Sequence, residues 1–238
     1  SLVCNHNDIT PSILRGFSAP VILKTDFKIE EYIHILKYDD DPFNKWDAVQ
    51  NLYIYFFIKN YNLNIFLNTL RELVLDKKVN NSLMALLLEL PSQSIFENLS
   101  NTVDPILIFK RKNKLMKKIA IDLQEVFERR ALKLIQGKIY NYGSIDERAL
   151  LEKLLKYLLL IDSEIGIQIA KKISVSKNMT LSIIGLKSLC MGDSKKALKY
   201  LDDFYKKWKN NNLVVEKWFQ MMSSLNIGTQ GLNFIKSL

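Results

Sequence analysis

The sequence contains few of the residues that build metal sites or disulfide frameworks. Its 238 residues include two histidines, His6 and His34, and neither begins an H-E-x-x-H motif or has a second histidine at helical spacing. The two cysteines, Cys4 and Cys190, lie far apart without ligand-forming neighbours, which argues against a zinc knuckle and favours a reducing, cytoplasmic setting. Spacing alone does not test a Ser-His-Asp arrangement, whose members meet only in space, and no local pattern indicates one. We therefore predict no catalytic, cofactor-binding or metal-binding residue in this chain.

Glycine-rich loops and long apolar runs are also missing. The eight glycines are scattered, and neither G-x-x-x-x-G-K-S/T nor G-x-G-x-x-G occurs, so no loop is expected to cradle a phosphate. No segment reaches the roughly 18 consecutive apolar residues of a membrane-spanning helix, and the first residues lack a signal-peptide pattern. The sequence therefore predicts no membrane span.

Proline is confined to the first 105 residues, at Pro11, Pro20, Pro42, Pro91 and Pro105. Because proline breaks helix interiors, the remainder of the chain is free to be helical between short turns. Within residues 11–24, Gly16 and Pro20 interrupt any helical period. The apolar run at 21–23 follows a proline and is typical of a strand, so we expect a short N-terminal β segment.

From about residue 28 the apolar residues recur with a helical period. We expect helices at about 28–38, 42–60, 63–76, 80–90, 93–100, 105–136, 144–159, 163–174, 178–191, 193–209 and 212–224, with a further candidate at 229–237. Short connections between about a dozen helices predict an all-α fold. The expected architecture is an irregular α-solenoid, a HEAT-like superhelix of antiparallel helix pairs with a short N-terminal β segment, without a strict repeat period.

Start and stop signals support these boundaries. Asp41 and Asp104 each precede a proline, which pairs a capping carboxylate with a residue suited to the first helical position. Gly137 is typical of a helix C-terminus. Ser144 and Glu147 have the S-x-x-E spacing of a capping box.

The charge is strongly basic, with a formal net charge of +9. The densest run of basic residues is 110–118. In one interpretation these residues contact nucleic-acid phosphates, and in the other they form the solvated face of a long helix. We favour the second, with Phe109, Met116 and Ile119 facing inward, because lysines alternate with Asp and Glu along nearly every helix. The acidic run at 39–41 lacks EF-hand spacing and is better explained as a helix stop and start. His34 is expected on the surface of an amphipathic helix, and no nucleic-acid partner is predicted.

Several short sequence motifs occur in an order typical of one family. They are P-S-I-L-R-G-F-S-A-P-V at 11–21, D-P-F-N-K-W-D-A at 41–48, L-P-S at 90–92 with D-P-I at 104–106, N-M-T at 178–180, and N-L-V-V-E-K-W-F at 212–219. The ordered set resembles the C-terminal region of bacterial M1-family (gluzincin) aminopeptidase N of the alanyl aminopeptidase type. Lys177 and Leu181 depart from the family's pattern around N-M-T.

The resemblance implies a division of the chain and of the parent protein. Residues 1–25 would be the end of a preceding β-sandwich domain or a linker, and 26–238 a helical C-terminal domain that continues past Leu238. The parent would be a zinc metallo-aminopeptidase that removes N-terminal residues from peptides, with zinc in a separate catalytic domain. Because this chain lacks H-E-x-x-H, it should be inactive alone.

The role that the resemblance implies is architectural. The helical domain would cap the active site and restrict the access of peptide substrates. Its partners would be the catalytic and β-sandwich domains of the same polypeptide, and an apolar or mixed surface patch is expected where it meets them. The alternative is a stand-alone α-solenoid that binds protein partners.

Overall fold

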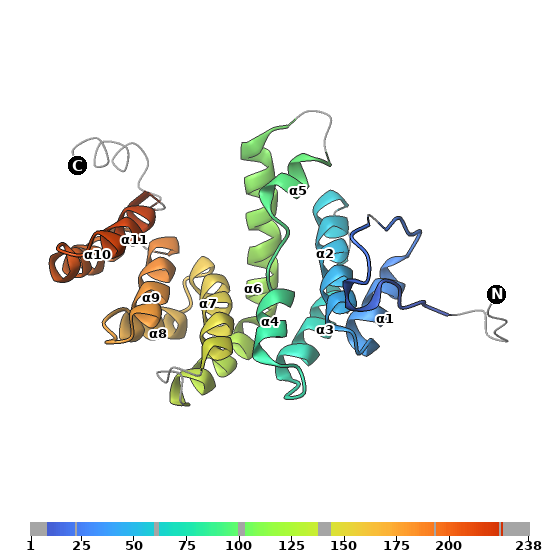
Figure 1. The fold of residues 1–238 in the computed structure, drawn as a ribbon, viewed down its shortest axis with the longest axis horizontal. Helices are drawn as coiled ribbons and strands as arrows, with labels where there is room; N and C mark the ends of the chain where they lie inside the picture. The colour runs from blue at the N-terminus through green and yellow to red at the C-terminus, as the bar shows by residue number, and fades with distance from the viewer. Residues whose placement is uncertain are drawn as a thin grey trace. The chain divides into compact units, whose positions relative to one another are not determined.

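We describe a computed structural model of residues 9–21, 23–59, 62–99, 103–137, 144–192, 194–223 and 225 (Figure 1). These residues form eleven α-helices and one short 3-10 helix, so the predicted all-α fold is confirmed. The chain divides into two compact units, Ser1–Leu115 and Met116–Leu238, and the boundary between them falls within α6.

The helix bounds follow the predicted ranges closely. The first unit contains η1 (Arg15–Phe17), α1 (Ile29–Tyr38), α2 (Pro42–Ile58), α3 (Asn64–Leu75), α4 (Asn81–Leu87), α5 (Gln93–Glu97) and the start of α6 (Pro105–Gln136). The second contains the rest of α6, α7 (Ile145–Leu160), α8 (Glu164–Ser174), α9 (Met179–Met191), α10 (Ser194–Trp208) and α11 (Asn212–Ser223). The candidate helix at 229–237 lies outside the described residues.

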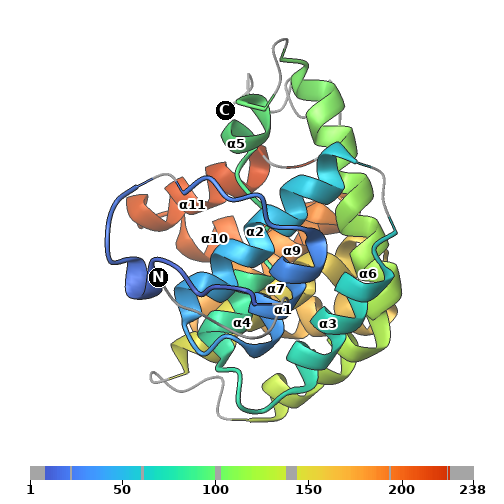
Figure 2. The same ribbon diagram turned by 90° about the vertical axis from the view of Figure 1, so that its right-hand side faces the viewer.

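The predicted N-terminal strand is only partly covered by the structure. Residues 9–21 and 23–28 contain no strand, and Ile22, at its centre, lies outside the described residues. The segment instead runs as extended and turn structure across α1 and α2 (Figure 2). A strand needs a partner to satisfy its backbone groups, and the described part of the chain supplies none.

The Asp-Pro start signals are confirmed by hydrogen bonds. The Asp41 carboxylate accepts from the Asn44 backbone N–H at 2.9 Å. The Asp104 carboxylate accepts from the backbone N–H groups of Ile106 and Leu107, both at 3.0 Å. As predicted, α6 ends immediately before Gly137. Each cap satisfies donors that have no partner within the helix.

The predicted capping box at Ser144 is wrong. Ser144 is the residue before α7, but its side chain makes no capping hydrogen bond. Its backbone, with φ −93° and ψ 48°, is not in the extended conformation that directs a capping hydroxyl at the third helical residue. Glu147 instead shares a hydrogen bond with Asp146, which raises the pKa of Glu147.

The core of the first unit forms where α2 meets α1, α3 and α4. Leu36, Leu52 and Tyr53 are fully buried there. The Tyr53 ring meets Phe66 of α3 edge-on at 5.4 Å between centroids, and its hydroxyl donates to the Leu87 carbonyl at 2.9 Å. Tyr53 of α2 thus contacts both α3 and α4.

The core of the second unit is built around α7, α8 and α9. Leu154, Leu158 and Ile173 are fully buried, and Tyr157 packs against Phe127 of α6 at 5.4 Å between ring centroids. The next helix pair, α10 and α11, contacts α9, and Trp218 of α11 donates its indole N–H to the Leu201 carbonyl at 3.0 Å. Successive antiparallel pairs therefore stack in chain order, as a solenoid does.

Candidate functional site

Among the described residues, those considered from sequence as possible ligands do not come together. His34 is exposed on α1 and lies against Tyr38, 4.9 Å between ring centroids. Within the described residues, no group of three or more His, Cys, Asp and Glu side chains could hold a metal ion. His6 and Cys4 lie outside the described residues. Cys190 is buried, and desolvation raises the pKa of its thiol to about 12, which leaves it without thiolate character at neutral pH.

The basic run at 110–118 lies in the first half of α6. Its cations are mostly exposed, namely Lys110, Arg111, Lys114, Lys117 and Lys118. Lys112 is the exception: its ammonium donates to the Pro91 carbonyl at 2.8 Å and lies over the Phe96 ring. The run is therefore a solvated helix face with one cation turned back onto the chain.

The inward face of α6 differs from the prediction at one position. Met116 and Ile119 are buried as expected, but Phe109 is 59% exposed and Ile108 is buried in its place. The buried positions 108, 115, 116 and 119 follow a helical period, and position 109 lies at the edge of that stripe, about 100° around the helix from position 108. The expectation for Phe109 was wrong because a helical period does not show whether another segment covers a residue at the edge of the stripe.

The three aspartates at 39–41 meet Arg15 of the N-terminal segment. The Arg15 guanidinium pairs with the carboxylates of Asp39, at 3.1 Å, and Asp40, and donates to the Ser12 hydroxyl at 2.9 Å. The Gly16 backbone N–H donates to Asp41 at 2.8 Å. We call these residues, together with Asn44, the Arg15 junction; it joins the N-terminal segment to the turn between α1 and α2.

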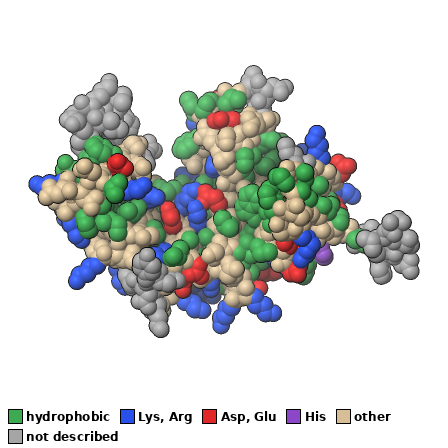
Figure 3. Space-filling view, in the orientation of Figure 1, with side chains coloured by type: hydrophobic (Ala, Val, Ile, Leu, Met, Phe, Trp, Pro, Cys, Tyr) green, Lys and Arg blue, Asp and Glu red, His purple; other side chains and the backbone are tan. Residues whose placement is uncertain are grey.

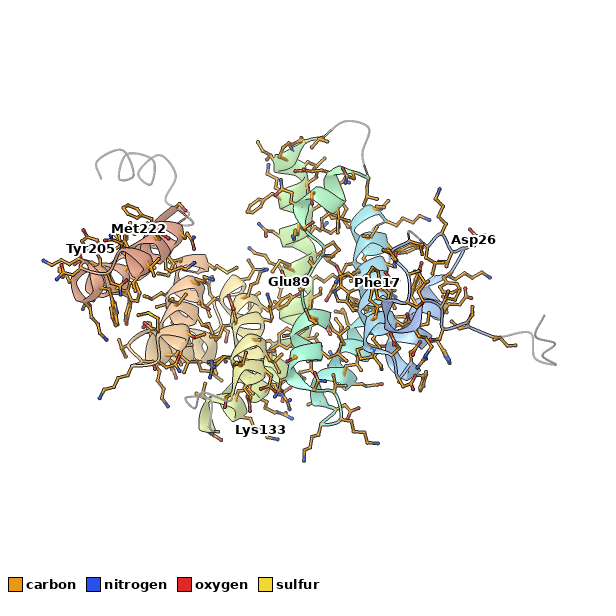
Figure 4. All side chains as sticks on the ribbon, in the orientation of Figure 1. Phe17, Asp26, Glu89, Lys133, Tyr205 and Met222 are labelled. Carbon is orange, nitrogen blue, oxygen red and sulfur yellow. The ribbon has the colours of Figure 1, made fainter. Side chains whose placement is uncertain are left out.

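The backbone on both sides of Arg15 adopts left-handed conformations. Leu14, Gly16 and Phe17 all have positive φ, between 52° and 63°. Such conformations are costly for residues with a side chain and persist only where the surroundings hold them. The holding contacts are the Arg15 junction and the Phe17 ring, which lies 5.0 Å from that of Phe43 (Phe17 is labelled in Figure 4).

Asp39 is the electrostatic centre of this junction. Its side chain is only 4% exposed, and this burial alone would raise its pKa. Hydrogen bonds from the Asp41 backbone N–H, Ser12 and Asn44, together with the charge of Arg15, nevertheless hold the pKa of Asp39 below its ordinary value. The folded state therefore favours the ionised carboxylate.

Replacing Asp39 with asparagine should reduce stability in a pH-dependent way. A depressed pKa contributes stability above the unfolded pKa, near 4, and this contribution disappears as pH falls through the folded value. We expect Asp39→Asn to lower the free energy of unfolding by about 1–3 kcal/mol at neutral pH. The difference in stability between the variant and the original protein should disappear below the folded pKa of Asp39. Urea unfolding at several pH values measures it. Asp40→Asn, at an exposed partner of the same arginine, should cost less than about 1 kcal/mol; equal losses would contradict this account.

A second feature is an exposed apolar surface on α5 and α6, which we call the α5–α6 face. It consists of Ile95, Leu99, Val103, Ile106, Leu107 and Phe109. In the space-filling view, hydrophobic side chains lie over the first turns of α6, whereas the surface over α5 is more polar (Figure 3). Exposed apolar residues that gather on one surface can mark a docking site, whereas single exposed apolar residues need no explanation. The predicted patch toward the other domains had no residues assigned to it from the sequence.

These features define a helical-repeat domain. Residues 29–238 match the family DUF3458_C, described as a domain of unknown function with ARM repeats. Because the match covers most of its length, the chain belongs to that family. The resemblance to the C-terminal helical region of M1-family aminopeptidases is likewise confirmed.

The chain is similar to aminopeptidase N of several bacteria. It is 24% identical to that of Escherichia coli over 233 residues, which cover 90% of this chain and 26% of the relative. It is 28% identical to that of Haemophilus influenzae over 229 residues, with the same coverage of 90% and 26%. For Caulobacter vibrioides the identity is 27% over 218 residues, covering 87% and 25%. The chain thus spans about a quarter of the length of these relatives.

A solved structure shares the fold. The crystal structure of Legionella pneumophila aminopeptidase A in complex with aspartic acid superimposes with a TM-score of 0.80 at 22% identity. The match covers 94% of this chain and 28% of the Legionella chain. The helical stack described above is therefore a known arrangement.

Proposed function

We propose that this chain is the non-catalytic helical part of a zinc-dependent M1 aminopeptidase that removes N-terminal residues from peptides. In this proposal it caps the active site and restricts the access of peptide substrates. The observation that carries it is the coverage: relatives named aminopeptidase N align with about 90% of this chain, which accounts for only 26% of their length. The remaining three quarters of such a polypeptide would contain the catalytic residues and the zinc site.

The proposal assigns the α5–α6 face to contact with the other domains. A patch containing Ile106, Leu107 and Phe109 is unfavourable in water and is stabilised when another surface covers it. The same polypeptide is the partner that the coverage of the relatives indicates. Residues 1–25 would form the end of the preceding β-sandwich or a linker, and the Arg15 junction would fix the direction in which the chain enters the helical domain.

Zinc fits poorly with the residues described here. The described residues contain no cluster of potential ligands, so the proposal places zinc and the general base elsewhere in the polypeptide. It also places the protein in the cytoplasm, a setting compatible with a free thiol at Cys190. No helix of the described chain is long and apolar enough to cross a membrane.

The purified chain should be inactive as a peptidase. We expect no stoichiometric zinc by elemental analysis and no hydrolysis of alanyl or leucyl p-nitroanilide above the blank. Chelator-sensitive hydrolysis by the pure chain would refute the non-catalytic assignment. The upstream coding sequence provides the second test: H-E-x-x-H-x18-E supports the proposal, and its absence favours a stand-alone interaction module.

A further inference from the structure

A pocket of about 440 Å³ opens between the N-terminal segment and helices α1 and α2. This volume lies within the range typical of small-molecule sites. Its apolar walls include Ile13, Val21 and Leu23 from the segment and Phe27 and Ile35 from the α1 side. All of these residues belong to the first unit, and the Arg15 junction holds the segment that forms one wall.

The pocket lining includes the carboxylate of Asp47, which can accept further hydrogen bonds. Asp47 of α2 accepts one side-chain hydrogen bond, from the Asn51 amide to Oδ2 at 3.1 Å. Its other carboxylate oxygen accepts none from the described residues, and no cation pairs with it there. Desolvation is the cause of the raised pKa of Asp47, which agrees with a half-buried carboxylate that has no positive partner.

The other charged and titratable groups lining the pocket do not compensate this carboxylate. Lys24 is exposed and therefore remains hydrated. The Tyr32 hydroxyl is already within hydrogen-bond distance of the Thr25 hydroxyl, at 3.1 Å.

The lining is mixed rather than wholly apolar, because Asn44 and Asn51 also face the pocket. The Asn44 amide already donates to Ser12 and Asp39, and the Asn51 amide to Asp47. The group that gains most from a further partner is therefore Asp47.

We propose that this pocket binds a small molecule that carries a protonated amine on an apolar body, with the amine on Asp47 and the body against the apolar walls. A protonated amine supplies the charge-assisted hydrogen bonds that Asp47 lacks. An aromatic or branched aliphatic body buries the exposed apolar surface of Val21 and Leu23. This site uses none of the chemistry of the proposed aminopeptidase.

The test is an NMR titration of the whole 238-residue chain with phenethylamine. We expect saturable shifts with a Kd of about 1 mM or tighter. Phenethyl alcohol, which lacks the charge, and hydrocinnamate, which would use Lys24 instead, should bind at least about ten-fold more weakly. Equal or tighter binding of either compound, or no saturable binding of phenethylamine, would overturn the proposal.

Variants identify the carboxylate responsible. Asp47→Asn keeps the shape and the Asn51 contact and should weaken phenethylamine binding at least about ten-fold. Glu30→Gln removes the same charge from α1 outside the pocket and should leave binding unchanged. Leu23→Asn, at an exposed wall position, should weaken binding without affecting the core. Retained affinity in Asp47→Asn, or an equal loss in Glu30→Gln, would show that Asp47 is not the anchor.

Discussion

Replacing Gly185 with alanine is expected to be among the most damaging single changes in this chain. A Cβ at this position of α9 would lie 2.6 Å from both the Ala170 carbonyl oxygen and the Ser174 backbone nitrogen of α8. These are backbone atoms of a neighbouring helix, so the clash is relieved only if α8 and α9 separate. We expect a loss of about 3 kcal/mol or more in the free energy of unfolding, at the upper end of overpacking costs.

The matched control is Gly137→Ala, at the end of α6. There the nearest atom to a new Cβ is the Leu134 carbonyl oxygen at 3.4 Å, close to an ordinary contact, and the residue is exposed. We expect a change within about 0.5 kcal/mol. Urea unfolding followed by circular dichroism measures both variants. If Gly185→Ala were as stable as Gly137→Ala, the close approach of α8 and α9 would be wrong.

Phe127→Ala should have an effect of similar size for the opposite reason. Phe127 is fully buried against Tyr157, and truncation leaves a cavity that the surrounding helices fill only partly. The expected loss is about 3–5 kcal/mol. Thermal and urea unfolding of the purified chain measure it.

Phe109→Ala is the control for Phe127→Ala, because it makes the same truncation in the same helix. Phe109 is exposed, so the isolated chain should lose no more than about 0.5 kcal/mol. If the α5–α6 face docks against other domains, the same change should matter in the complete polypeptide, where the ring would be covered. A large loss of stability in the isolated chain would mean that Phe109 belongs to the core after all.

Phe127→Ala and Phe109→Ala distinguish a role of α6 in folding from a role in contact with other domains. The buried stripe of α6 contributes to folding, whereas its exposed apolar residues contribute nothing in the isolated chain. Under the proposed function such a division is expected, because a surface that other domains cover need not be polar.

The order of the helices could be predicted because their signals are local. Apolar residues three and four positions apart mark each helix, and Asp41 and Asp104 begin two of them by capping neighbouring backbone groups. The scarcity of histidine and cysteine is likewise a property of the sequence, and the ordered family phrases need no coordinates. The capping box at Ser144 failed because residue types at the right spacing do not fix the backbone angles that a cap needs.

Only the tertiary structure decided which distant residues meet. The phrases at 11–21 and 41–48 were both noticed in the sequence, yet the pairing of Arg15 with Asp39, 24 residues away, depends on the path of the turn between them. A helical period likewise gives a stripe but not the partner that covers it, so Ile108 is buried and Phe109 exposed. The tight fit at Gly185 and the pocket above Asp47 are also contacts between separate segments. Local sequence determined the helices of this protein, and long-range packing determined its junction, its pocket and its exposed apolar face, because those features depend on how separate segments pack together.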